Sequence, residues 1–297
     1  MATVQDLKRR IRSVTNTRKI TKAMELVASA RLRRAEARIS ALRPYADRML
    51  ELMGITARAA GSVRLPLLER RENVTRVALL PITADRGLAG AFNAQILRRA
   101  FALERELRGE GLEVGWLVAG RRGRSSLTFR GYDLIQAWQG FSERPDYSDA
   151  QAIARRAAEL YANEEVDRVV VVYNHFQSAL VQQVTVQDLL PIPEKMVAAG
   201  GEDDARQAAL RGDFIYEPEP EQILERLLPV YVETELYRAL LESAASEQGA
   251  RMTAMRNASS NAGELIDGLT LAMNRARQAE ITQEILEVVA GADALTA

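Results

Sequence analysis

The sequence contains no cysteine, which excludes disulfide bonds, thiolate metal sites and a cysteine nucleophile. Its single histidine, His175, leaves little material for a multi-histidine metal site or a histidine-based catalytic triad. Aromatic residues make up only 5% of the chain. A chain poor in large rings and rich in Ala, Leu, Arg and Glu is typical of long helices. These absences restrict the catalytic and metal sites that the chain could form.

The chain also lacks a net charge and a long apolar run. Lysine plus arginine equals aspartate plus glutamate, at 40 each, so the whole-chain charge favours neither nucleic acid nor a membrane surface. No stretch approaches the ~18 consecutive apolar residues that a membrane-spanning helix requires. The first residues, MATVQDLKRRIRSV, carry charges where a signal peptide has an apolar region. We expect no direct insertion into a membrane.

The first part of the chain has a helical pattern. Between Val4 and Ala60 there is one proline, Pro44, and one glycine, Gly54. Apolar residues, among them Leu7 and Ala28, form the seam of a heptad pattern that predicts a coiled-coil helix over residues 1–62, followed by a linker over 63–73. A polar interruption falls at Arg18, Thr21 and Glu25, and the nearby apolar residues move to Ile20, Met24 and Val27.

The middle of the chain, residues 74–192, has a different pattern. The short, Val-rich runs RVALLPIT, EVGWLVAG, RVVVVYN and VQQVTV are typical of buried strands. Segments with helical periodicity lie between them. Strands that alternate with helices indicate an α/β domain with a largely parallel sheet, and the last two strands are close enough in sequence to form a hairpin at one edge.

A second linker is predicted over residues 193–218, because this segment combines prolines, glycines and a charge cluster. The heptad pattern then returns and predicts a long helix over 219–297. The seam of this helix, which includes Met255, Ala262 and Leu265, holds for over seven heptads from Tyr237. A helix of some 50 residues is about 75 Å long, more than one domain needs. The two terminal helices are expected to pair antiparallel and to bury each other's apolar seams. The fold class is therefore mixed, an α/β domain combined with a long antiparallel coiled coil.

Three segments resemble one family. They are SVTNTRKITKAMELVASARLRRAE from Ser13, ITADRGLAGAFN from Ile82, and the run from Ser246 that begins SEQGARMTAMRNASSNAGELIDG. Together they are similar to the gamma subunits of F-type ATP synthases, of the bacterial type that lacks the regulatory cysteine insertion. The resemblance implies a Rossmann-like central domain carried by the coiled coil.

The resemblance also implies a function. The family forms the non-catalytic central rotor shaft, which couples proton-driven rotation to ATP synthesis or hydrolysis in the alpha/beta head. By this resemblance we expect no catalytic residues, no metal site and no cofactor. Its partners are the alpha and beta subunits, the epsilon subunit and the membrane c-ring. Its expected location is the cytoplasmic face of the plasma (inner) membrane, as a peripheral protein.

Eight residues match family positions in contact with partners. The positions implied to contact the head or the N-terminal helix are Met24, Arg251, Arg277, Gln278, Thr282 and Glu284. Tyr216 and Glu217 match positions against the membrane ring. The alternative for the C-terminal residues is that they form ordinary surface pairs of a helix.

The segment from Lys8 to Arg43 is strongly basic, with only Glu25 and Glu36 as acids. Such an imbalance favours an acidic partner. By the resemblance, that partner is the acidic lever loops of the beta subunits. From charge alone it could be nucleic acid, which leaves a basic coiled-coil nucleic-acid-binding protein as an alternative.

A third hypothesis is an α/β enzyme with helical oligomerisation arms. RGLAGAFN follows a strand and precedes a helix, as a phosphate-binding loop does. However, it has no Gly-Lys-Ser/Thr ending and its spacing is not Gly-x-Gly-x-x-Gly. The second strand ends at Arg121 and Arg122 and not at an acid that could bind a ribose. We expect these glycines to serve a tight strand-to-helix turn.

Overall fold

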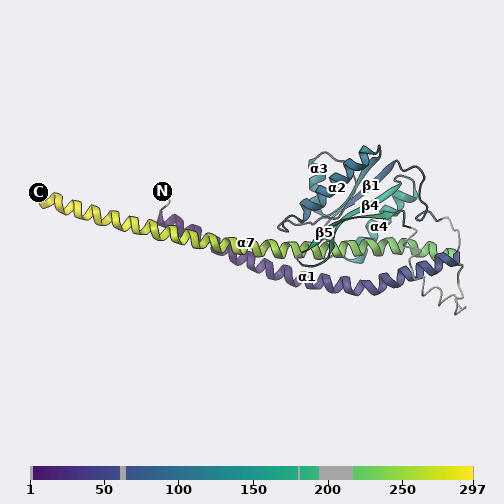
Figure 1. The fold of residues 1–297 in the computed structure, drawn as a ribbon, viewed down its shortest axis with the longest axis horizontal. Helices are drawn as coiled ribbons and strands as arrows, with labels where there is room; N and C mark the ends of the chain where they lie inside the picture. The colour runs from purple at the N-terminus through teal and green to yellow at the C-terminus, as the bar shows by residue number, and fades with distance from the viewer. Residues whose placement is uncertain (1–2, 61–64, 180, 194–216, 297) are drawn as a thin grey trace. The chain divides into compact units, whose positions relative to one another are not determined.

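A computed structural model describes residues 3–60, 65–179, 181–193 and 217–296 (Figure 1). The chain divides into two compact units, one formed by residues 1–28 with 252–297 and the other by residues 29–251. The linker predicted over 193–218 lies almost entirely outside the described residues. The division into residues 1–62, 74–192 and 219–297, with linkers between them, stays a prediction.

The described elements are four strands of a parallel sheet, one antiparallel edge strand and five helices. Two long helices, α1 (Val4–Ala60) and α7 (Pro220–Thr296), contribute to both units. The remaining helices are α2 (Phe92–Gly109), α3 (Arg121–Phe129) and α4 (Tyr147–Ala162). The strands are β1 (Arg76–Pro81), β2 (Glu113–Ala119), β3 (Leu134–Trp138), β4 (Arg168–Phe176) and β5 (Gln182–Leu190).

The sheet of the larger unit has the strand order β3-β2-β1-β4-β5. β1 pairs in parallel with β2 and β4, whereas β4 and β5 form an antiparallel hairpin with Tyr173 opposite Thr185. This confirms the predicted α/β domain, and the hairpin lies at the edge of the sheet as expected. Two elements escaped the sequence analysis, namely β3 and α3.

Alternate residues of each strand enter two separate cores. On β1, Val77 and Leu79 pack under α2 and α3, while Ala78 and Leu80 face α4 and the long helices (Figure 1). Each fully buried Leu or Val contributes about 1.5–3 kcal/mol. The second core also contains α1 residues such as Met53 and α7 residues such as Leu236. The sheet therefore buries this face with the help of both long helices.

The two missed elements have weak sequence signals. α3, with the sequence RRGRSSLTF, is short and holds a glycine and two serines, which are poor helix formers. Gly123 is nevertheless required, because a Cβ atom there would lie 2.7 Å from both Thr83 Oγ1 and Val118 Cγ2. β3 is only partly buried at the edge of the sheet, so it lacks the continuous apolar run of β1 or β4.

The smaller unit pairs the two long helices antiparallel. Arg256 Nε lies 3.1 Å from Glu25 Oε1, and the Cβ position of Gly263 lies 3.9 Å from Arg18 Cζ. Residues nearer the N-terminus of α1 therefore lie beside residues nearer the C-terminus of α7. The buried α1 positions Leu7, Thr21 and Ala28 follow the predicted seam.

On α7 the predicted seam is only partly correct. Met255 and Ala262 are buried as expected. Leu265, also assigned to the seam, is 58% exposed, while its neighbour Ile266 is partly covered. A straight α-helix rotates by about 20° per heptad relative to a strict seven-residue repeat. Along α7 the residue that faces α1 is therefore displaced by one position from the heptad count.

Asp167, at the entry to β4, anchors the start of β1. Its carboxylate accepts hydrogen bonds from Thr75 N at 2.7 Å and Arg76 N at 2.9 Å, and it pairs with Arg71 at 2.8 Å. Burial by itself would raise the pKa of this carboxyl group. The backbone donors, with the guanidinium, outweigh burial and hold the pKa well below its usual range.

We predict that Asp167→Asn lowers the free energy of unfolding at pH 7 by roughly 3 kcal/mol, because it leaves Arg71 and two N–H groups without a carboxylate. Because the pKa of Asp167 is lower in the folded state, its charge stabilises the fold fully above the unfolded-state pKa of about 3.9. This stabilisation is lost as the pH falls below that value toward the folded-state pKa. The difference from the wild type should therefore shrink below about pH 4. Denaturant unfolding across pH measures both effects. Glu113→Gln, which breaks an exposed pair with Arg76, is the control, and equal losses in the two variants would contradict the prediction.

The antiparallel register makes a second prediction, which the absence of native cysteine makes clean to test. Arg18→Cys combined with Gly263→Cys should cross-link within one chain through a short bis-maleimide. Arg18→Cys with Leu286→Cys should not, because 23 further residues of helix correspond to about 35 Å. Mass spectrometry of the monomer identifies the linked peptides. A link in the control pair alone would show that the register is wrong.

Candidate functional site

An apolar stripe lies on the basic part of α1. Ile20 is 60% exposed and Val27 is 52% exposed, while Met24 between them is half-buried. These residues are spaced four and three apart, so they share one face of the helix. Thr21 and Glu25 are buried toward α7 in their place. At the polar interruption, apolar side chains therefore point outward over about two turns of the helix.

Glu25 is held in the seam by two cations. Lys22 Nζ lies 3.0 Å and Arg256 Nε 3.1 Å from its two carboxylate oxygens. The Lys22 hydrogen bond, followed by the one from Arg256, lowers the pKa of this carboxyl group. The acid therefore stays charged at neutral pH and ties the two helices together at this point.

The segment Arg277–Gly291, near the end of α7, is exposed on every side. All residues from Arg277 to Gly291 are exposed, including five large apolar ones: Ile281, Ile285, Leu286, Val288 and Val289. The hydroxyl of Thr282 donates to the carbonyl oxygen of Gln278 at 2.9 Å, which places these two residues on one face as expected. A helix that leaves large apolar side chains exposed over four turns presents a surface suited to a partner.

The predicted contact residues of the smaller unit form two separate groups. Met24 lies one residue from Glu25, which meets Arg256 of α7. Gln278 is 22 residues further along α7, or about 33 Å at the rise of an α-helix. Arg277, Gln278, Thr282 and Glu284 therefore share one end of α7, and Met24 lies elsewhere on the helix pair.

Arg251 lies in the larger unit and is almost completely buried. Its Nη2 pairs with Glu247 Oε1 at 2.6 Å and donates to the carbonyl oxygen of Gly87 at 3.3 Å. Burial raises the pKa of Glu247, against the opposing effect of Arg251. The described contacts of Arg251 are thus made inside the chain, and its contact with another subunit stays a prediction.

The carboxyl edge of the sheet, where doubly wound domains hold nucleotides, is occupied by the chain itself. Asp85 accepts hydrogen bonds from the backbone N–H groups of Arg121, Gly140 and Ser142 at 2.8–3.0 Å. Above it, Ser246 of α7 donates to the carbonyl oxygen of Asn174 at 3.2 Å. The cavity left between α7 and this edge measures about 10 Å³, room for no more than one water molecule.

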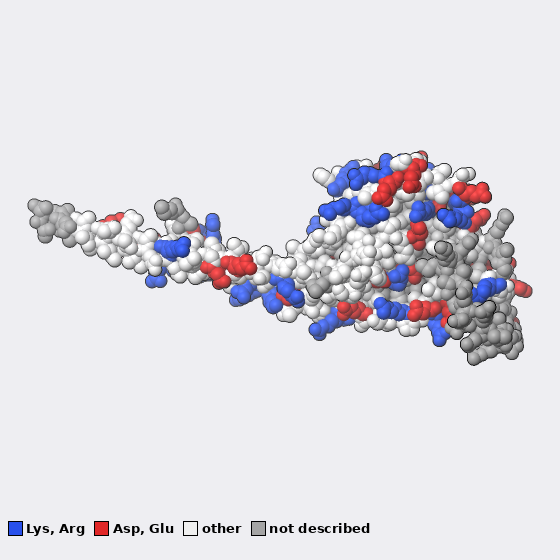
Figure 2. Space-filling view, in the orientation of Figure 1, with Lys and Arg blue, Asp and Glu red and all other residues white. Residues whose placement is uncertain are grey.

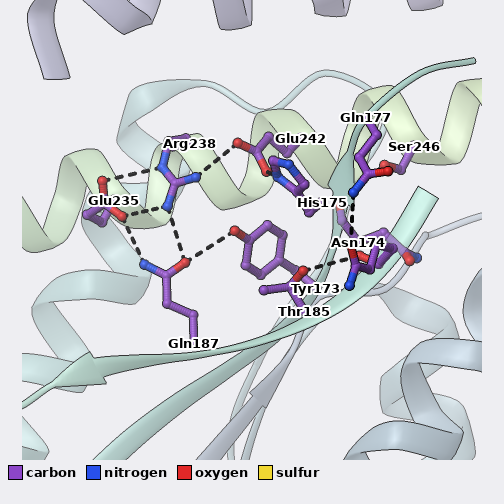
Figure 3. A network of polar contacts seen from close by, with 11 residues as sticks. Tyr173, Asn174, His175, Gln177, Thr185, Gln187, Glu235, Arg238, Glu242 and Ser246 are labelled. Atoms are coloured by element: carbon purple, nitrogen blue, oxygen red, sulfur yellow. Dashed lines mark hydrogen bonds and ion pairs between the residues drawn. The ribbon is translucent and has the colours of Figure 1, made fainter. Parts of the chain in front are cut away.

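A polar network fastens β4 and β5 to α7 (Figure 3). Arg238 is at its centre, with Glu235 at 2.7 Å, Glu242 at 3.0 Å and Gln187 at 3.2 Å. Burial, partly offset by Arg238, raises the pKa of Tyr173, whose hydroxyl donates to Gln187, to about 12. His175 Nδ1 lies 2.5 Å from Glu242 Oε2, so the single histidine belongs to this network, although the sequence suggested no special role for it.

The charge distribution differs between the α/β domain and the first helix. Figure 2 shows positive and negative side chains intermingled over the α/β domain. In contrast, the first helix has twelve basic residues and two acids between Lys8 and Arg43. Of the residues matched to the membrane ring, Glu217 is exposed just before α7 and Tyr216 lies outside the described residues. In the described part of the chain, every helix is too short or too polar to span a bilayer.

Comparisons with known proteins agree over the full length. A family model described as ATP synthase matches residues 3–295. The ATP synthase gamma chain of Rubrobacter xylanophilus is 47% identical over 297 residues and covers 100% of both chains. The gamma chain of Moorella thermoacetica is 45% identical, covering 99% of this chain and 100% of the relative.

Solved structures show the same fold. A chain in the Euglena gracilis mitochondrial ATP synthase, in a structure of OSCP, F1 and c-ring, has a TM-score of 0.71. The match covers 98% of this chain and 94% of that one at 19% identity. A chain from the Tetrahymena thermophila central stalk and c-ring is 28% identical with a TM-score of 0.58, covering 81% of this chain and 99% of that one.

Proposed function

This chain belongs to the family of ATP synthase gamma chains, and on that premise we propose that it is the central rotor shaft of an F-type ATP synthase. In this role it couples proton-driven rotation to ATP synthesis or hydrolysis in a head of alpha and beta subunits. The observation that carries the proposal is full-length identity of 47% to a gamma chain, together with a helix end that is exposed on every side.

The exposed end of α7 is the part that we assign to the head. Its five large apolar side chains have no cover within the described chain, and burying each one would gain about 1.5–3 kcal/mol. Arg277, Gln278, Thr282 and Glu284 are exposed on the same turns and would contact fixed loops of the head.

The apolar stripe of Ile20, Met24 and Val27 is the second head contact that we propose. It lies within the basic segment of α1, which suits the acidic lever loops of the beta subunits. Charge attraction between exposed groups is weakly directional and worth about 0.2–1 kcal/mol per pair. Such contacts let a surface turn past its partner without locking to it.

The remaining assignments concern the foot of the shaft and follow from family membership. We propose that Tyr216 and Glu217 contact the membrane ring and that the α/β domain, residues 74–192, also contacts the epsilon subunit. The chain would then be a peripheral protein at the cytoplasmic face of the plasma (inner) membrane. We further propose that it is non-catalytic, which is supported by α7 occupying the carboxyl edge of the sheet.

The mechanism is a bias of conformational states. The two helices present different side chains around their circumference, so each beta subunit meets a different surface at each angle. A contact that favours one state of a catalytic subunit over another shifts its nucleotide affinity. Moving a two-state subunit from 1:99 to 99:1 takes about 5.5 kcal/mol of differential contact, which a few charge pairs with apolar contacts would supply.

Reconstitution tests the proposal directly. Mixing the chain with alpha and beta subunits should give a complex of all three that hydrolyses ATP, with rates that depend on the presence of this chain. Size-exclusion chromatography and a coupled ATPase assay measure the two outcomes. Failure to assemble would refute the proposal, and a salt-dependent shift of DNA mobility by the free chain would instead favour a nucleic-acid-binding protein.

We predict that Met24→Lys impairs coupling more than assembly. An added ion pair with an acidic loop is worth about 0.5–1 kcal/mol, which corresponds to roughly a two- to five-fold change in the population of one rotor position. ATP-driven proton uptake per ATP hydrolysed in proteoliposomes should fall accordingly. Met24→Leu, which keeps the size and the apolar character, should couple normally. Wild-type coupling in the lysine variant would remove Met24 from the proposed contact.

A further inference from the structure

The structure points to a joint between the α/β domain and both long helices. Glu143, in the loop between β3 and α4, faces three arginines from three different parts of the larger unit. Its carboxylate lies 2.5 Å from Arg31 of α1, 3.5 Å from Arg86 of the β1–α2 loop and 3.7 Å from Arg251 of α7. One carboxylate thus connects the domain to both helices.

The surrounding contacts strengthen the same connection. Arg38, one heptad after Arg31 and on the same face of α1, donates to the carbonyl oxygen of Pro145 at 3.2 Å. On the domain side, Asp85 Oδ2 accepts from Ser142 N at 3.0 Å, and Asp85 N donates to Ser142 Oγ at 2.8 Å. The loop that carries Glu143 is therefore tied to the end of β1 on one side and to α1 on the other.

Burial makes the charge of Glu143 matter to its neighbours. The Arg251 side chain is only 7% exposed, and its Nη1 is buried without a hydrogen bond in the described structure. Two carboxylates lie near this guanidinium: Glu247 pairs with Nη2, and Glu143 faces Nη1. Removing the charge of Glu143 would leave half of a buried guanidinium without an opposing charge, which is costly in a poorly solvated site.

The position of the joint in the chain suggests its role. The two units are linked covalently at two points, after Ala28 on α1 and after Arg251 on α7. Arg31 is three residues from the first link and Arg251 is at the second. A twist that travels along the two helices passes these links, and the Glu143 cluster holds both helices to the domain next to them.

We propose that Glu143 is a positioning residue for torque transfer: with Arg31, Arg86 and Arg251 it makes α1 and α7 turn together with the α/β domain. This inference rests on the proposed rotor function and assigns Arg251 a role inside the chain. It does not require Glu143 to contact another subunit.

The test uses the complete enzyme with its membrane sector, reconstituted in liposomes, and the variant Glu143→Gln. Proton uptake per ATP hydrolysed should fall about twofold while ATP hydrolysis and assembly stay close to wild type, because a part-buried charge network is broken without loss of the apolar core. The torsional stiffness of the rotor is measured from the thermal fluctuations of a bead attached to the α/β domain while the rotor is bound to the head. This stiffness should be lower in Glu143→Gln than in the wild type. Stiffness is the readout that a purely stabilising residue would not change.

Two further variants make the outcome decisive. Arg31→Gln removes the same ion pair from its more exposed partner and should reproduce the loss of stiffness if Glu143→Gln folds poorly. Glu113→Gln breaks an exposed pair with Arg76 at the amino end of β2 and should behave as wild type. Normal stiffness and coupling in both Glu143→Gln and Arg31→Gln would overturn the inference.

The controls separate this inference from the proposed function. A wild-type chain that fails to support coupled ATP hydrolysis refutes the rotor function itself. If the wild type and Glu113→Gln are functional and Glu143→Gln is as stiff as both, only the proposed role of Glu143 is refuted.

Discussion

The structure of the larger unit depends on one shared core. The α/β sheet has two apolar faces, and α2 with α3 covers only one of them. The other face is buried by α4 together with residues of α1 and α7, including Met49, Met53 and Leu228. Because this face would otherwise be exposed to water, the domain cannot separate from the long helices without losing core. Apolar burial is non-directional, however, and does not by itself fix an orientation.

Directional contacts supply that orientation. The Arg238 network lies along β4 and β5, and the Glu143 cluster lies at the carboxyl edge of the sheet. Both bring charged groups into poorly solvated positions, where a pair with good geometry about offsets its desolvation cost. Such groups add little net stability, but they penalise any other alignment of helix and sheet. A shaft that must turn as one body with its domain benefits from this specificity.

The same edge of the sheet explains why a familiar α/β fold need not bind a nucleotide here. The Asp85 carboxylate accepts three N–H groups from two segments, the start of α3 and the β3–α4 loop, where N–H groups of a nucleotide-binding domain would face phosphate. α7 lies against the same edge, where Ser246 donates to the carbonyl oxygen of Asn174 in β4 and Arg251 donates to that of Gly87 in the β1–α2 loop. The chain has thus filled the position with its own carboxylate and helix, and the fold alone carries no enzymatic implication.

Periodicity in the sequence determined the long helices, the four strong sheet strands and the α1 seam, because these features repeat over enough residues to be read locally. Three long sequence segments, which begin at Ser13, Ile82 and Ser246, indicated the family. Tertiary structure alone decided the rest. It placed Leu265 outside the seam and Ile266 within it, revealed β3 and α3, and buried Arg251 among Glu143, Glu247 and Gly87. Glu143 had no local signal at all, since its three arginine neighbours lie 57 to 112 residues away in the sequence. Contacts of that kind depend on how distant segments pack, and no short stretch of sequence contains them.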